Sequence, residues 1–398
     1  MSTFGERLAL AQERFKRWSG VCLMAGVRPM TFLHPHLPAR MRERLPLGWT
    51  WPMFREAITS LGRRFYVDIP HDMEIPAQPA PACEVEPAYR LSAEELASFY
   101  RDGFLGPIDV FTPAEMVTLR EELVEVMERR ESEVYPLAPG KTEFVRGPIP
   151  ESAVRSAIQT RDRYIDCEPV WRIIAHKAIT ERLAQLLGPD LLVWRSQFYN
   201  KGPGAEALGW HSESCFLFDG AGRVPALEPR APAELFQITV WMAVDDADRE
   251  NGCMHFLPGS HRSMQPLTLV KPPTLRPGEE VAWWHVTRSL TADVPWGDQF
   301  PIPQRYYDEG LVAAMPLRAG QCVLFTERAT HASPPNLSQR RRLGVNFRVV
   351  RGDVAVNRQL DFADFRSIQA RFSLERWGTI PLRGPSATTN RVVPPPTQ

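Results

Sequence analysis

The stretch "LFQITVWMAVDD", residues 235–246, sets the expectation for the fold. It combines β-branched and aromatic residues and ends in two aspartates, which predicts a strand that runs into a turn. Similar runs lie between turn-forming residues at four other places: "LLVWRSQFYNK" (191–201), "CMHFLPGS" (253–260), "QCVLFTERATHAS" (321–333) and "RLGVNFRVV" (342–350). Short strands of this kind, separated by turns, are typical of a β-sandwich or barrel.

The sequence ahead of these strands favours helices. A capping box, in which a serine or threonine precedes a glutamate by three residues, marks a helix start. Four helices are predicted here: after Ser92 with Glu95, after Thr112 with Glu115, and near residues 168–177 and 178–188. Helices followed by strands predict an α+β protein whose core is a double-stranded β-helix (a jelly-roll or cupin-like fold) with N-terminal and flanking helices.

Proline content divides the chain into three predicted parts. The sequence has 38 prolines, and their clusters favour loops and linkers over long helices. We expect an N-terminal extension over 1–90 with a Pro-rich linker, a jelly-roll domain over 91–380, and a C-terminal tail over 381–398. Within the domain, the aromatic and Pro-rich stretch 260–310 is interpreted as an insertion or lid over the site.

Composition excludes several classes of function. The 398 residues carry a net charge of zero, and there is no basic stripe or polybasic cluster of the kind that nucleic acids or membrane surfaces attract. No apolar run is long enough to span a bilayer, and the N-terminus lacks the apolar core of a signal peptide. The six cysteines are scattered without a CxxC pair, which is typical of reduced thiols. A cytoplasmic protein is therefore expected, and the composition is compatible with an oligomer.

The motif "GWHSES", residues 209–214, suggests half of a metal site. Alternate residues of a strand share a face, so His211 and Glu213 would point the same way. A third ligand would come from His331, at the end of another apolar run. Two histidines and one carboxylate suit Fe(II) and leave positions for co-substrate and oxygen. Taken singly, an H-x-E pair on a surface strand and a structural histidine before a turn remain the alternatives.

A run of arginines follows the distal histidine. Arg342 opens the strand after "SQRR", and alternation places it on one face with Gly344, Asn346 and Arg348. A guanidinium group matches a carboxylate, so Arg342 is a candidate partner for the remote carboxylate of a chelating co-substrate such as 2-oxoglutarate. The alternative is that Arg340, Arg341 and Arg342 form a solvated turn.

At these residues the chain resembles the phytanoyl-CoA dioxygenase family of Fe(II)/2-oxoglutarate oxygenases. The matching elements are "WHSES", "ITVWMAVDDADRENGCMHFLPGSHR" and "HASPPNLSQRRRLGVNF", and the resemblance covers roughly 92–380. Within the family the chain is similar to the syringomycin-type aliphatic halogenases. Those enzymes have a small residue in place of Glu213 and an asparagine where Phe218 stands here. Both departures imply a hydroxylase rather than a halogenase.

The resemblance also implies a role for each candidate residue. His211, Glu213 and His331 would bind iron. Arg342 would hold 2-oxoglutarate, and the co-substrate pocket would be lined by Thr239 and Trp241, with Arg348 beside them. The substrate would be faced by Gln197, Tyr199 and Phe218. The implied reaction hydroxylates an aliphatic C–H of a natural-product amino acid or acyl group, free or carrier-bound, with succinate and CO2 as co-products. Halogenation, desaturation or cyclisation is the alternative within the family, and a silent jelly-roll binding protein the alternative outside it.

Overall fold

The computed structural model describes most of the jelly-roll region and parts of the N-terminal third. The described residues are 4–27, 29–36, 54–55, 58–59, 61, 83–137, 141–144, 150–212, 226–229, 234–262, 268–269, 287–288, 304–358, 362–363, 365–367, 370–384 and 390–397. Glu213 and Phe218, together with most of the predicted insertion 260–310, lie outside them.

The helices of the described part come mainly before the strands. They are α1 (Phe4–Val27), η1 (Thr31–His36), η2 (Pro87–Tyr89), α4 (Ala93–Asp102), α5 (Pro113–Glu128), α6 (Glu151–Gln159), α7 (Glu168–Ile174), α8 (Lys177–Leu187), η4 (Ser260–Arg262) and α9 (Gln304–Asp308). Both predicted capping boxes are formed, by Ser92 with Glu95 and by Thr112 with Glu115. Among the described residues, no helix combines the length and apolarity that crossing a membrane requires.

Two of the predicted helix boundaries shift, and helix α6 is not among the predicted ones. The chain leaves α7 at Ala175, and the His176 ring accepts a hydrogen bond from the Ala178 amide, so that His176 caps α8. This cap separates α7 from α8, where the sequence suggested helices that meet at residues 177 and 178. Helix α6 begins after Pro150 without a side-chain cap, which is why the capping signals gave no sign of it.

The strands form two main sheets. The strands of these sheets are β1 (Phe104–Asp109), β3 (Leu191–Lys201), β4 (Leu208–His211), β6 (Gln237–Ala243), β7 (Met254–Phe256), β10 (Ala313–Met315), β11 (Gln321–Thr326), β12 (His331–Ser333), β13 (Arg342–Arg351) and β17 (Ile380–Arg383). The major sheet has the order β1-β11-β6-β13-β3-β17, and the minor sheet has the order β10-β7-β12-β4. All their pairings are antiparallel, as a jelly roll requires.

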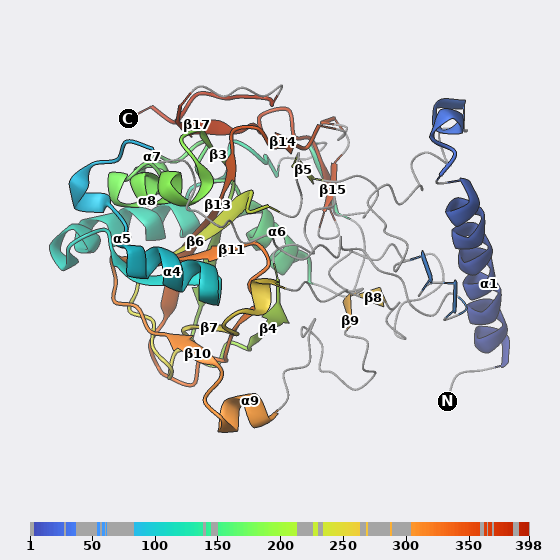
Figure 1. Cartoon of the computed structure of the whole chain (residues 1–398), viewed down its shortest axis with the longest axis horizontal. Helices are drawn as coiled ribbons and strands as arrows, with labels where there is room; N and C mark the ends of the chain where they lie inside the picture. Colours follow the sequence, from blue (N-terminus) through green and yellow to red (C-terminus); the bar gives the residue numbers. More distant parts are fainter. Residues whose placement is uncertain are drawn as a thin grey trace.

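Smaller pairings lie around these sheets. They are formed by β2 (Thr142–Phe144), β5 (Leu227–Glu228), β8 (Thr268–Leu269), β9 (Thr287–Arg288), β14 (Ala355–Val356), β15 (Phe365–Ser367) and β16 (Ala370–Phe372). Strand β17 crosses the predicted end of the domain at residue 380, and Val392 forms a bridge with Thr379. Helix α1 lies apart from the two sheets, on the other side of the view in Figure 1.

The two faces of the major sheet pack against different elements. On the outer face, Leu343, Val345 and Phe347 of β13 belong to a core cluster with residues of α4, α5, α7 and α8, and these helices cover that side of the sheet (Figure 1). On the inner face, Trp241 and Phe325 pack with residues of the minor sheet. Alternation along β13 therefore turns Arg342, Gly344, Asn346 and Arg348 into the space between the sheets.

Candidate metal centre

Two of the predicted metal ligands meet across the minor sheet. His211 ends β4 and His331 begins β12, and the two residues are direct partners in the antiparallel register. Their ring centroids are 4.2 Å apart. Both side chains are buried, His211 at 8% and His331 at 2% exposure. The fold thus joins two histidines that are 120 positions apart in the sequence.

Each histidine ring is oriented by a hydrogen bond to the backbone carbonyl two residues before it. The Nδ1 of His211 lies 2.7 Å from the Gly209 carbonyl oxygen, and the Nδ1 of His331 lies 2.8 Å from the Ala329 carbonyl oxygen. A carbonyl only accepts, so both Nδ1 atoms carry the proton and donate it. The neutral ring then keeps its lone pair on Nε2, and this is the tautomer that binds a metal through Nε2.

Burial keeps the distal ring neutral. The pKa of His331 lies well below its ordinary value, first because burial disfavours the charged ring and second because His211 lies beside it. Two imidazoles on adjoining strands suit a borderline divalent cation such as Fe(II). No group of three His, Cys, Asp or Glu side chains suited to a metal occurs among the residues that the structure describes. The carboxylate ligand, Glu213, falls outside those residues and stays a prediction.

A pair of buried cations lies next to this centre. Lys201 ends β3 and is the register partner of Arg342 on β13. The Lys201 Nζ donates to the Ser333 hydroxyl at 2.8 Å, to the Ser333 carbonyl at 3.0 Å and to the Pro334 carbonyl at 2.6 Å. The Arg342 guanidinium donates to the Ser333 hydroxyl at 3.1 Å and to the Gly252 carbonyl at 2.8 Å. Ser333 is two residues from His331 on the same strand, so the cations adjoin the histidine pair.

Among the residues that the structure describes, Lys201 and Arg342 donate hydrogen bonds only to neutral oxygens. Burial, and then the Arg342 charge, lowers the pKa of Lys201 to about 7, and burial lowers the pKa of Arg342 to about 10. The Arg342 Nε is buried without a hydrogen-bond partner in the described part of the chain. A carboxylate brought by a ligand would supply the missing negative charge. Lys201 and Ser333 were not anticipated as site residues, because only the register of β3 with β13 and of β12 with β4 reveals their position.

Trp241 lines the wall beside the cations, and Thr239 lies two residues before it on β6. The Arg342 Cζ lies 5.0 Å from the centroid of the Trp241 ring. Gly344 leaves room for that ring, since a Cβ at this position would lie 2.2 Å from Trp241 Cζ2. Thr239 is fully buried, and its hydroxyl has no hydrogen-bond partner among the residues described. Arg348 faces Thr239 across the strand pair β13–β6, and its charge contributes to lowering the His331 pKa.

The predicted substrate contacts occupy β3. Tyr199 is the register partner of Gly344 and is half-buried. Gln197 is the partner of Asn346, and its amide nitrogen donates to the Thr160 hydroxyl at 2.6 Å. The Gln197 side chain is thus directed toward the end of α6. Phe218 lies outside the described residues, so its contact with a substrate stays a prediction.

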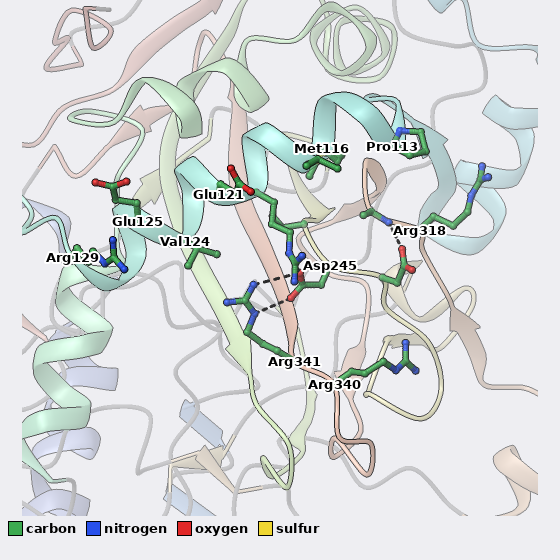
Figure 2. Close-up of a pocket in the computed structure, with 15 residues that line it drawn as sticks. Pro113, Met116, Glu121, Val124, Glu125, Arg129, Asp245, Arg318, Arg340 and Arg341 are labelled. Atoms are coloured by element: carbon green, nitrogen blue, oxygen red, sulfur yellow. Dashed lines mark hydrogen bonds and ion pairs between the residues drawn. The ribbon is translucent and has the colours of Figure 1, made fainter.

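A groove of about 980 Å³ lies on the outside of the barrel, between α5 and the loops that end β6 and precede β13 (Figure 2). Its centre is Asp245, whose carboxylate binds Arg120 at 2.5 Å and Arg341 at 3.0 Å. These ion pairs tie α5 to the strand ends. Asp245 and Asp246 lie in the turn that the sequence suggested, and Arg341 is paired rather than solvated. The groove contains no member of the histidine and cation clusters.

Comparison with known proteins gives a consistent result. A family model described as phytanoyl-CoA dioxygenase (PhyH) matches residues 99–344. Phytanoyl-CoA dioxygenase domain-containing protein 1 of Rattus norvegicus is 28% identical over 187 residues, which are 46% of this chain and 53% of that protein. The match thus spans about half the length of that relative. Ectoine dioxygenase of Bordetella parapertussis is 26% identical over 253 residues, covering 62% of this chain and 71% of the relative.

Solved structures show the same architecture. The structure described as CytC3 with Fe(II) and alpha-ketoglutarate superposes with a TM-score of 0.54, covers 77% of this chain and 94% of its own, and shares 24% identity. This likeness shows the fold, and it confirms the predicted jelly roll with flanking helices.

Proposed function

The chain belongs to the phytanoyl-CoA dioxygenase (PhyH) family, whose members use Fe(II), 2-oxoglutarate and O2, and from this we propose that it hydroxylates an unactivated aliphatic C–H bond. The proposed substrate is a natural-product intermediate, an amino acid or acyl group, either free or tethered to a carrier protein. Succinate and CO2 are the co-products. Membership of this family of dioxygenases is established, whereas hydroxylation of such a substrate is the proposal.

One observation carries the proposal, namely two oriented histidines beside two buried cations that share one hydroxyl. His211 and His331 present Nε2 lone pairs because backbone carbonyls hold both Nδ1 protons. Lys201 and Arg342 both reach Ser333, two residues from His331. A metal at the histidines and a carboxylate at the cations would therefore be neighbours. 2-Oxoglutarate joins a chelating keto acid to a remote carboxylate, so its two ends match the two clusters in chemistry.

Each residue then has a separable part in the proposed reaction. His211, His331 and Glu213 would hold Fe(II), which with 2-oxoglutarate and O2 would supply the oxidising power for C–H hydroxylation. Lys201 and Arg342 hold the remote carboxylate and thereby fix the orientation of the co-substrate. Trp241 packs under the Arg342 guanidinium and limits where that group can move. The apolar cluster of Phe325, Phe256 and Trp241 keeps water from the wall behind His331.

Glu213 supports hydroxylation over halogenation. A carboxylate as third ligand fills the iron position that a halide would need, and its replacement by a small residue would open that position. Desaturation and cyclisation share the same site residues, so product analysis has to separate them from hydroxylation. A silent binding protein is the alternative of another class.

An anaerobic titration of the metal-free protein with Fe(II) and 2-oxoglutarate tests the proposal. We expect the weak visible charge-transfer band of the chelate in the wild type and not in His211→Ala. His255→Gln is the matched control, since His255 lies on β7 beside the site but between the inward-facing Met254 and Phe256. If wild type and control show the band, succinate release with candidate substrates follows. A wild type without the band would contradict the oxygenase assignment and favour the binding protein.

A further inference from the structure

A second group of cations lies at the other end of the inner face. Arg195 on β3 is the register partner of Arg348 on β13. Both guanidinium groups lie against the Trp194 ring, with Cζ-to-centroid distances of 4.7 Å for Arg195 and 5.9 Å for Arg348. Arg161 follows α6 and forms a β-bridge with Gln197, two residues from Arg195. Three arginines from three segments thus converge at this end of the barrel.

Arg195 is the member of this group whose charge is not balanced by a contact. Among the residues that the structure describes, its guanidinium makes no hydrogen bond or ion pair, and its Nε is buried. Burial and the charges of Arg161 and Arg348 lower the pKa of Arg195 to about 10. The residue is nevertheless only half-buried, so its side chain is not sealed from solvent. An enclosed cation without an anionic partner is costly, and such groups commonly serve ligand binding.

The nearby carboxylate of Asp162 already accepts hydrogen bonds from other residues. Asp162 is fully buried, and its carboxylate accepts hydrogen bonds from the Tyr135 hydroxyl at 2.5 Å and the Ser196 amide at 2.9 Å. It weakens the field of the arginines without contacting Arg195. In the described part of the chain, the charged side chains that act on Arg195 are Arg161 and Arg348, which carry its own sign, and Asp162, so its surroundings favour an incoming anion.

This anion cannot be the bound 2-oxoglutarate. Arg342 and Arg348 are six residues apart on β13, which corresponds to ~20 Å along a strand. A five-carbon diacid held by Arg342 and Lys201 does not reach from that anchor to Arg195. Both groups adjoin the histidine pair, since the Arg348 charge acts on His331 and Arg342 binds Ser333, two residues from His331. An anion at Arg195 would therefore belong to the substrate rather than to 2-oxoglutarate.

We propose that Arg195, supported by Arg161 and Arg348, binds a free carboxylate of the substrate. The inference rests on the proposed oxygenase function and narrows its substrate class to compounds that carry an ionised acid near the oxidised carbon. A substrate whose only carboxyl group is tied up as a carrier-protein thioester lacks this anion. The cluster therefore distinguishes a free acid from a carrier-bound acyl group.

Binding of matched acids and amides tests the assignment directly. Straight-chain carboxylates and amino acids of two to six carbons, and the carboxamide of each, are titrated against the full-length protein loaded anaerobically with Fe(II) and 2-oxoglutarate. We expect acids to perturb the charge-transfer band at concentrations about tenfold or more below those of their amides. Arg195→Met should abolish this preference, and Arg195→Lys should keep part of it. Equal binding of acids and amides by the wild type, or no acid-dependent change, overturns the proposal.

The melting temperature of the variants tests independently whether the Arg195 charge has a partner in the protein. Arg195→Met removes an unbalanced buried charge, so the melting temperature should hold or rise. Arg341→Met is the matched control, because Arg341 is paired with Asp245 and its loss should lower the melting temperature. A fall for Arg195→Met comparable to that control means that an acid of the chain already pairs with Arg195, and this overturns the inference. Absence of the charge-transfer band in the wild type would instead refute the oxygenase function itself.

Discussion

Lys201 and Arg342 face each other across β3 and β13, and both donate a hydrogen bond to the hydroxyl of Ser333. Two cations held at one neutral oxygen repel each other, and burial deprives both of water. The arrangement gains stability when an anion joins it. This relationship makes the co-substrate anchor a two-residue unit rather than a single arginine.

Replacing Lys201 by methionine should weaken 2-oxoglutarate binding by about ten- to a hundredfold, because one of two charged hydrogen bonds to the carboxylate is lost. Lys201→Arg should lose less, since the charge remains. The dissociation constant is read from the charge-transfer band at saturating Fe(II). Lys177→Met serves as control, because Lys177 is exposed and binds Glu86 on the surface. Unchanged binding in Lys201→Met would remove Lys201 from the anchor.

The affinity for 2-oxoglutarate should fall as the pH rises through neutrality. In the ligand-free protein the pKa of Lys201 is about 7, because burial and Arg342 disfavour its charged form. A bound carboxylate favours the ammonium and raises that pKa, so binding takes up a proton above neutral pH. The dissociation constant should be flat below about pH 6 and increase up to about tenfold per pH unit above about pH 7.

Two variants separate this effect from other titrations. Lys201→Arg keeps its charge across the range, so its affinity should stay nearly constant between about pH 6 and about pH 8.5. Lys201→Met should bind 2-oxoglutarate weakly, and its dissociation constant should not rise with pH. A slope that survives in Lys201→Met would assign the titrating proton to another group.

Gly344→Ala should destabilise the protein by about 1–3 kcal/mol, because the added methyl group overpacks the inner face. Its Cβ would lie 2.2 Å from Trp241 Cζ2 and 2.6 Å from Cε2, so the indole must move. Since Trp241 packs against Arg342, 2-oxoglutarate binding should weaken as well. Urea unfolding measures the first effect and the charge-transfer titration the second.

A double-mutant cycle identifies the cause of that loss. Trp241→Phe removes the atoms that a Cβ at position 344 would meet, so Gly344→Ala should cost less in this background than in the wild type. Gly202→Ala is the control, because a Cβ there meets nothing within 4 Å. An additive cycle would mean that the indole does not cause the loss.

The parts of the fold that depend on residues close together in the sequence could be predicted from the sequence. The capping boxes at Ser92 and Thr112 placed two helices because the hydrogen bonds that form them are local. Alternation along "RLGVNFRVV" placed Arg342 and Arg348 on one face because side chains of a strand alternate. Helix α6, which starts at a proline without a cap, follows no such rule and was missed.

The site was predictable only as far as its residues carry a motif. His211 lies in "WHSES" and His331 precedes the arginine run, so both could be named before their contact was known. Lys201 and Arg195 carry no motif. Their roles follow from register, which pairs them with Arg342 and Arg348, and register depends on packing between distant segments. The amide of Gln197 is bound to Thr160 of the neighbouring helix end, a contact that strand alternation could not reveal.

Glu213 is the residue on which the choice between hydroxylation and halogenation depends, and its proposed role as a metal ligand can be tested without a substrate. Glu213→Asp should retain Fe(II), whereas Glu213→Gly should bind it at least about tenfold more weakly in chloride-free buffer, because one of three ligands is lost. Added chloride should restore the charge-transfer band in Glu213→Gly, since a halide can fill the opened position. In the wild type chloride should have no effect, because the carboxylate already fills it. Fe(II) affinity that is equal in Glu213→Gly and the wild type would remove Glu213 from the metal site, and the expectation of a hydroxylase would then lose its main support.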